Sequence, residues 1–174
     1  MARIEYPSID TPEAQHVAEE VKRLRGGRLL NLYRMQLYNP EITAGWLQLG
    51  TAIRFRSSLD GATRELAICM VARLTGADYE WRGHSRVALQ EGISQTQLDS
   101  LPDQWQAGEA FDARQRAVLA AAAELTRHVH MQDATAEALR SHLSPREVVE
   151  VVATVAYYNM CARFLEGLEI DVDE

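Results

Sequence analysis

Three ionisable residues near the middle of the chain have the types and the spacing that proton transfer requires. Glu80 and His84 are four residues apart, so on a helix they lie on one face, about one turn from each other. A histidine, with an unperturbed pKa of about 6.5, is suited to acid–base chemistry, and a neighbouring carboxylate can act as a base or orient the ring. The same spacing is common in pairs on solvated helix surfaces, so this pair alone does not identify a site.

Glu65 favours a site over a surface pair. It lies in the segment RELAICMVA, residues 64–72, whose other members are mostly apolar. A carboxylate buried there without a partner costs several kcal/mol, so Glu65 must either reach the surface or find a partner. We therefore predict that Glu65, Glu80 and His84 come together.

Two helices joined by a tight turn would position these residues. We predict a buried helix over residues 61–76, capped by Asp60, and a second helix over residues 79–92, capped by Asp78 and closed by a glycine. Gly76, between them, can adopt the positive φ of a helix C-cap. The turn can then bring the glutamate of the first helix to the pair on the second.

Helical patterns extend through most of the rest of the chain. The remaining predicted helices cover residues 12–24, 29–38, a segment starting at 40, a short turn after 94, residues 112–130, residues 133–142 and an apolar helix starting at 145. No strand-like alternation is found in the sequence. We predict an all-α fold, a compact bundle of about six to eight helices that forms a single domain over residues 1–174.

Composition restricts the partners and the compartment. The chain has 174 residues with 18 basic and 25 acidic side chains, and its net charge of −7 has the wrong sign for a domain held on nucleic acid. No apolar run approaches the roughly 20 residues of a membrane span, and the first residues show no export signal. We expect a cytoplasmic protein with no nucleic-acid or membrane partner, and a small anionic molecule as ligand.

Metal and thiol chemistry are not predicted. Glu65, Glu80 and His84 are acceptable metal ligands by type, but they are too few for a clear metal site. Cys69 and Cys161 are far apart in sequence and lie within apolar stretches, so they form neither a CxxC redox pair nor a zinc knuckle. We expect both cysteines to be buried, and we expect no metal and no cofactor.

The stretch TRELAICMVARLTGADYEWRGHSRVALQEGI, residues 63–93, resembles the core of the carboxymuconolactone decarboxylase family, whose other branch is the alkylhydroperoxidase D type. Its Arg-Glu-Leu at 64–66 and its Glu-Trp-x-x-His at 80–84 are similar to the decarboxylase branch. The peroxidase branch has a CxxCxxxH motif, and alignment on His84 puts Ala77 and Glu80 at the two cysteine positions. The resemblance is strongest over about residues 40–125.

This resemblance implies an alkylhydroperoxidase D-like bundle in which the N-terminal and C-terminal helices pack on the core. It implies a trimer or hexamer and a cofactor-free carbon–carbon lyase, which decarboxylates or isomerises a small anionic lactone or carboxylate. The catalytic residues would be Glu65, Glu80 and His84. Thiol-dependent peroxidase activity is not expected, because such a cycle needs a thiolate and a resolving thiol.

Four further residues are candidates for substrate binding: Arg64, Trp81, Arg163 and Tyr157. The arginines could hold an anionic group, although exposed arginines commonly form surface salt bridges only. Trp81 could equally be a packing anchor. Tyr157 lies on a helix so apolar that one face must contact either the site or another subunit.

Two alternatives to the lyase remain. One is a non-catalytic ligand-binding or scaffold protein with the same fold, and the other is a divergent peroxidase-type oxidoreductase. A catalytic Glu80–His84 pair must line a reachable cavity, whereas a structural pair would be sealed in packing or bound to a neighbouring subunit.

Overall fold

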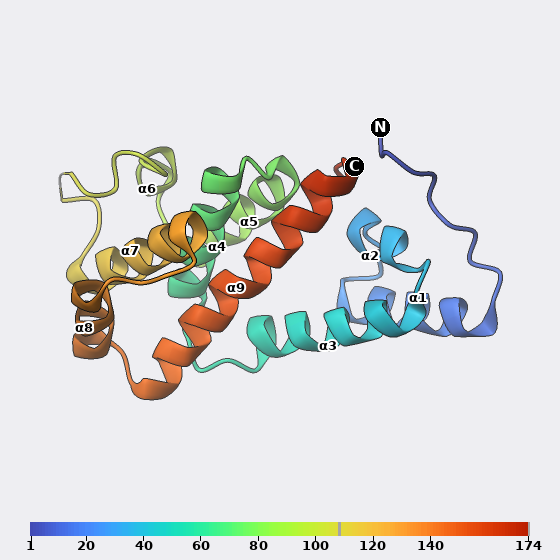
Figure 1. Ribbon diagram of the computed structural model, residues 1–174, viewed down its shortest axis with the longest axis horizontal. Coiled ribbons are helices and arrows are strands. Elements are labelled where there is room, and N and C mark those ends of the chain that lie inside the picture. The colour runs from blue at the N-terminus through green and yellow to red at the C-terminus, as the bar shows by residue number, and fades with distance from the viewer. Residues whose placement is uncertain (108, 174) are drawn as a thin grey trace. The chain divides into compact units, whose positions relative to one another are not determined.

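The structure is a computed structural model that describes residues 1–107 and 109–173, and these residues form helices joined by turns and loops (Figure 1). The helices are α1 (Pro12–Leu24), α2 (Asn31–Gln36), α3 (Pro40–Phe55), α4 (Gly61–Thr75), α5 (Asp78–Gln90), α6 (Gln95–Asp99), α7 (Ala113–His128), α8 (Asp133–His142) and α9 (Pro145–Leu168). The all-α prediction is confirmed. The described residues hold nine helices rather than six to eight, because the short α2 and α6 count as helices.

The helix ends follow from local side-chain chemistry. The Asp60 carboxylate accepts a hydrogen bond from the backbone N–H of Thr63, which starts α4 as predicted. Gly76 ends α4 with a φ of 69°, the left-handed conformation that glycine adopts without strain. The prediction for Asp78 was wrong by one position. Ala77 is the N-cap of α5 without a side-chain bond, and Asp78 lies in the first turn, where the helix dipole favours a carboxylate.

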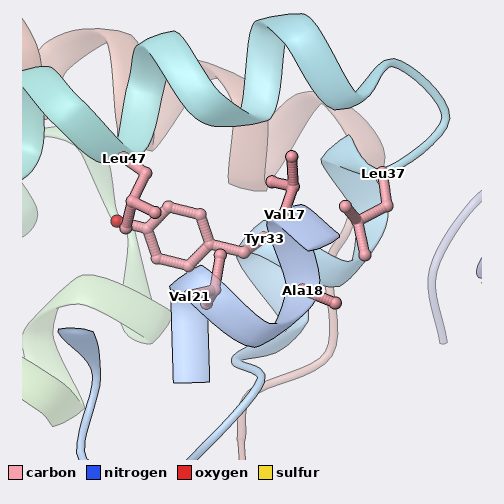
Figure 2. Packing of buried hydrophobic residues seen from close by; sticks show 6 residues of the cluster. All are labelled: Val17, Ala18, Val21, Tyr33, Leu37 and Leu47. Atoms are coloured by element: carbon pink, nitrogen blue, oxygen red, sulfur yellow. The ribbon is translucent and has the colours of Figure 1, made fainter. Parts of the chain in front are cut away.

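The chain separates into two compact units. The first unit comprises Met1–Arg56 and Phe164–Glu174, and the second comprises Ser57–Arg163. The first unit has a core in which Val17 and Val21 of α1, Tyr33 of α2 and Leu47 of α3 pack together (Figure 2). The prediction of one domain over the whole chain stays a prediction.

The second unit is built around α4, which packs against both α5 and α7, while α7 also packs against α8. Residues 66–71 of α4 are all 0–1% exposed, so α4 is the buried helix that its composition predicted. A helix buried on every side fixes the position of each of its side chains, including Glu65, which is the one carboxylate on this helix.

Of the described helices, α9 is the one whose length and apolar composition would suffice to cross a bilayer. Core helices of globular folds meet the same criteria, so this is weak evidence for a membrane. The expectation of no membrane partner stays a prediction.

Candidate functional site

Glu65, Glu80 and His84 lie together in the second unit. The ring Nδ1 of His84 is 2.6 Å from Oε2 of Glu65, and its Nε2 is 3.3 Å from Oε2 of Glu80. The turn at Gly76 and Ala77 makes this contact possible, because it folds α5 back along α4. The predicted meeting of the three residues is confirmed, and their catalytic role stays a prediction.

This cluster is almost completely shielded from solvent. Glu65 is 0% exposed, Glu80 is 6% exposed and His84 is 8% exposed. The second oxygen of Glu65 is also engaged, because Nε of Arg64 lies 3.2 Å from Oε1. The carboxylates of Glu65 and Glu80 carry two negative charges, and Arg64 supplies one positive charge. A protonated His84 supplies the second positive charge and balances the cluster.

The electrostatics of the cluster keep that proton on the ring. Burial alone would lower the pKa of His84 from its usual 6.5, because a low-dielectric site disfavours the charged form. The interactions with the Glu65 and Glu80 carboxylates outweigh burial and raise the pKa of His84 to about 9. His84 is therefore an imidazolium at neutral pH, whereas its ordinary pKa of about 6.5 was assumed from the sequence.

Sequence reasoning missed the role of Tyr158. Its ring meets the His84 ring edge-on, with centroids 4.8 Å apart and an interplanar angle of 82°. Tyr157, the predicted residue, instead makes an edge-on contact with Tyr158 at 5.3 Å. The adjacent tyrosines on an apolar helix indicated that one of them contacts the site. The sequence alone did not determine which tyrosine faces α5.

Cys69 lies one turn after Glu65 on α4 and is fully buried. Burial and the nearby charges of Glu65 and Glu80 raise the pKa of its thiol well above the usual range, so it stays protonated. Cys161 is also buried and free. The expectation of buried, unpaired cysteines is confirmed.

The other predicted binding residues are dispersed. Arg64 contacts the cluster through Glu65. Trp81 instead packs against Arg73, whose guanidinium lies 4.8 Å from the centroid of the Trp81 ring, and this contact indicates a packing role for Trp81. Arg163 is exposed and donates to Asn159 on its own helix, away from His84. Within residues 1–107 and 109–173, no group of three or more His, Cys, Asp or Glu side chains is placed to hold a metal ion.

Comparison with known families agrees with this arrangement. Residues 40–124 match the profile of the carboxymuconolactone decarboxylase family. Over these residues, the chain belongs to that family. The match covers the described α4–α5 turn and the whole Glu65–Glu80–His84 cluster, and it coincides with the stretch in which the resemblance is strongest. No curated protein matches the sequence.

Solved structures share the fold of this carboxymuconolactone decarboxylase family member. An uncharacterised peroxidase-related protein from Silicibacter sp. is 21% identical with a TM-score of 0.82, over 99% of this chain and 92% of that one. A peroxidase-related protein with an alkylhydroperoxidase AhpD core, from Ralstonia eutropha, is 18% identical with a TM-score of 0.82, over 99% and 93%.

A third neighbour is a cysteine-to-alanine variant of the debrominase Bmp8 in complex with 2,3,4-tribromopyrrole. It is 18% identical with a TM-score of 0.75, over 99% of this chain and 90% of that one. At these identities the likeness establishes the fold alone. The predicted alkylhydroperoxidase D-like fold is confirmed. The neighbours include a peroxidase-related protein and a debrominase, so the shared fold does not assign a reaction.

Proposed function

We propose that this family member is a cofactor-free proton-transfer enzyme that decarboxylates or isomerises a small anionic lactone or carboxylate. The observation that supports it is the position of His84, whose two ring nitrogens face two buried carboxylates. This arrangement makes the imidazolium a fixed proton donor at neutral pH.

The three residues have different roles in this proposal. Glu65 is a positioning residue, because it is fully buried and holds Nδ1 at 2.6 Å. The Nε2–H of His84 is the proton that is transferred, since its contact with Glu80 is longer, at 3.3 Å, and both residues retain slight exposure. Glu80 then returns a proton from solvent to the ring.

Decarboxylation without a cofactor needs an electron-withdrawing group on the substrate and an acid for the product enolate. Loss of carbon dioxide leaves the bonding electron pair on the enolate, and Nε2–H of His84 donates the proton that completes the product. In the proton-transfer step the protonated ring is the group that would contact the anionic substrate, and its pairing with Glu65 holds it in place.

The near-complete burial of the cluster favours a second candidate, the non-catalytic ligand-binding or scaffold protein. In that case the ion pairs hold α4 against α5 and transform nothing. A divergent thiol peroxidase has less support, because the thiol of Cys69 is buried and held protonated. Assembly as a trimer or hexamer and a cytoplasmic location remain predictions.

The experiment that tests the enzyme is a screen of small lactones and β-keto carboxylates, followed by kinetics of variants. We expect His84→Gln to lower kcat by roughly 10²–10⁴-fold and Glu80→Gln to cost a comparable factor. The two losses should be strongly non-additive in the double variant, because the residues act as one unit. The matched control is His128→Gln, at an exposed histidine on α7.

The value of kcat/KM should also fall as pH rises through about 9, where His84 of the free enzyme loses its proton. Circular dichroism must show that each variant is folded. Unchanged turnover in folded His84→Gln would overturn the mechanism. Ligand binding without any transformation would favour the scaffold or binding protein.

A further inference from the structure

The second unit holds a cavity of about 570 Å³ that the proposed reaction does not use. It lies between the C-terminal half of α7 and one face of α9. Its lining residues are Leu125, Val129, Val152, Val155, Ala156, Asn159, Met160 and Arg163. The volume falls within the range of about 300–1,000 Å³ that small-molecule sites occupy.

This cavity is separate from the His84 cluster. The lining residues of α9 recur every three or four positions, so they form a single stripe along the helix. At 100° per residue, Tyr158 lies roughly 130° around α9 from the centre of that stripe. Because the Tyr158 ring contacts His84, the cluster and the cavity lie on different sides of α9.

One polar edge interrupts the apolar lining. Nη1 of Arg163 donates to the backbone carbonyl oxygen of Asn159 at 2.9 Å and to its Oδ1 at 2.7 Å. The Asn159 amide is itself held, because Nδ2 donates to Oγ1 of Thr126 at 2.9 Å and to the carbonyl oxygen of Val155 at 3.0 Å. Asn159 therefore fixes the guanidinium at the cavity edge.

The rest of that guanidinium is available to a ligand. Neither Nε nor Nη2 of Arg163 bonds to any described residue, and no carboxylate in the described part of the chain forms an ion pair with it. Two parallel N–H groups on a planar cation match the two oxygens of a carboxylate.

The rim of the cavity also contains a strained residue. Val129 has a φ of 62°, and its side chain is 83% exposed. The left-handed conformation is unfavourable for a β-branched residue, and this helix end would ordinarily have glycine or asparagine. The strain places an apolar side chain at the cavity mouth, where a ligand would cover it.

We propose that this cavity binds an apolar monocarboxylate, with its hydrocarbon part against the valines and Met160 and its carboxylate on Nε and Nη2 of Arg163. A single cation beside an apolar lining fits one negative charge on a hydrocarbon body better than it fits a phosphate or a polyanion. The proposal is independent of the proposed function, because none of the reacting groups lines the cavity.

Titration calorimetry with decanoate, decanol and decylamine tests the proposal on the full chain. Wild type should bind decanoate more tightly than decanol and should bind decylamine least. Arg163→Gln should weaken decanoate binding about 10- to 100-fold, the range expected for losing a charge-assisted hydrogen bond. Decanol binding should change less than twofold. The matched control is Arg140→Gln, at an exposed arginine of α8.

Ala156→Trp fills the cavity from the exposed side of α9 and should weaken both decanoate and decanol. Absence of decanoate binding to wild type, or equal binding by wild type and Arg163→Gln, would overturn the proposal. Decanoate binding that is lost in Glu80→Gln but kept in Arg163→Gln would place the ligand at the His84 cluster instead.

A second copy of the chain is the competing occupant of this apolar face. Light scattering across a dilution series, with and without decanoate, separates the two cases. An oligomer that Ala156→Trp dissociates, together with no decanoate binding, would overturn the proposal and assign the face to self-association.

Discussion

His84 should contribute stability that depends on pH in a defined direction. Its pKa is about 6.5 in an unfolded chain and about 9 in the folded protein. Each pKa unit corresponds to 1.36 kcal/mol, so the preference of the folded state for the proton is worth on the order of 3 kcal/mol. The ring is only 8% exposed, so solvent screens this interaction little.

The sign follows from the raised pKa. Below pH 6.5 the folded and unfolded chains are both protonated at His84, and the full stabilisation is present. Above pH 6.5 the unfolded chain releases its proton first, so the stabilisation falls as pH rises and is gone once the folded form titrates near pH 9. At pH 7.5 about 2 kcal/mol should remain.

Urea unfolding of wild type and His84→Gln at pH values between 6 and 10 measures this contribution. The difference in unfolding free energy between the two proteins isolates His84 and its interaction with Glu65 and Glu80, because the remaining titrating groups are common to both. We expect the difference to shrink by about 3 kcal/mol across this range. His128→Gln, at an exposed histidine of α7, is the matched control. A difference that stays constant or grows with pH would refute the assignment of a protonated His84.

Three other predictions test separate features. The pKa of Glu150 is lowered to about 2 despite partial burial, chiefly by hydrogen bonds from Ser58. Glu150→Gln should therefore cost about 1–2 kcal/mol of unfolding free energy at pH 7, and this cost should fade as pH drops from 4.5 towards 2. Val129→Gly should raise the unfolding free energy by about 1 kcal/mol, whereas Val129→Ala, which keeps the Cβ, should not. Peroxide consumption with a dithiol reductant should be absent; robust turnover that vanishes when Cys69 and Cys161 are both changed to serine would contradict the inert cysteines.

Most helix boundaries could be predicted from the sequence, because helix caps depend on residues that are close together along the chain. The predicted cap at Asp60 is present, since it needs only a side chain three residues from a backbone N–H. The assignment of Asp78 as a cap failed by one residue. Its short side chain suits a cap and a first helical turn equally well, and the geometry of the turn after Gly76 decided between them.

The three residues of the cluster could be predicted from the sequence, but the side chains of α9 that lie near them could not. Glu65 stood out because a carboxylate on an apolar helix needs a partner, and His84 is that partner. Helical spacing did not determine how α9 turns toward α5, so Tyr157 was chosen where Tyr158 makes the contact. Arg163 was misplaced for the same reason: it lies on another side of α9.

The raised pKa of His84 links the two candidate functions of the cluster. A general acid works best when its pKa lies near the working pH, and a value of about 9 makes the free imidazolium a reluctant donor. Glu80 is the contact that a substrate can most readily disturb, because it is the longer of the two and retains slight exposure. A substrate that separates Glu80 from Nε2 would lower the pKa of the ring toward its ordinary value and make the proton available when the substrate is bound. Without such a substrate, both carboxylates keep their contacts, and the cluster serves only to hold α5 on α4.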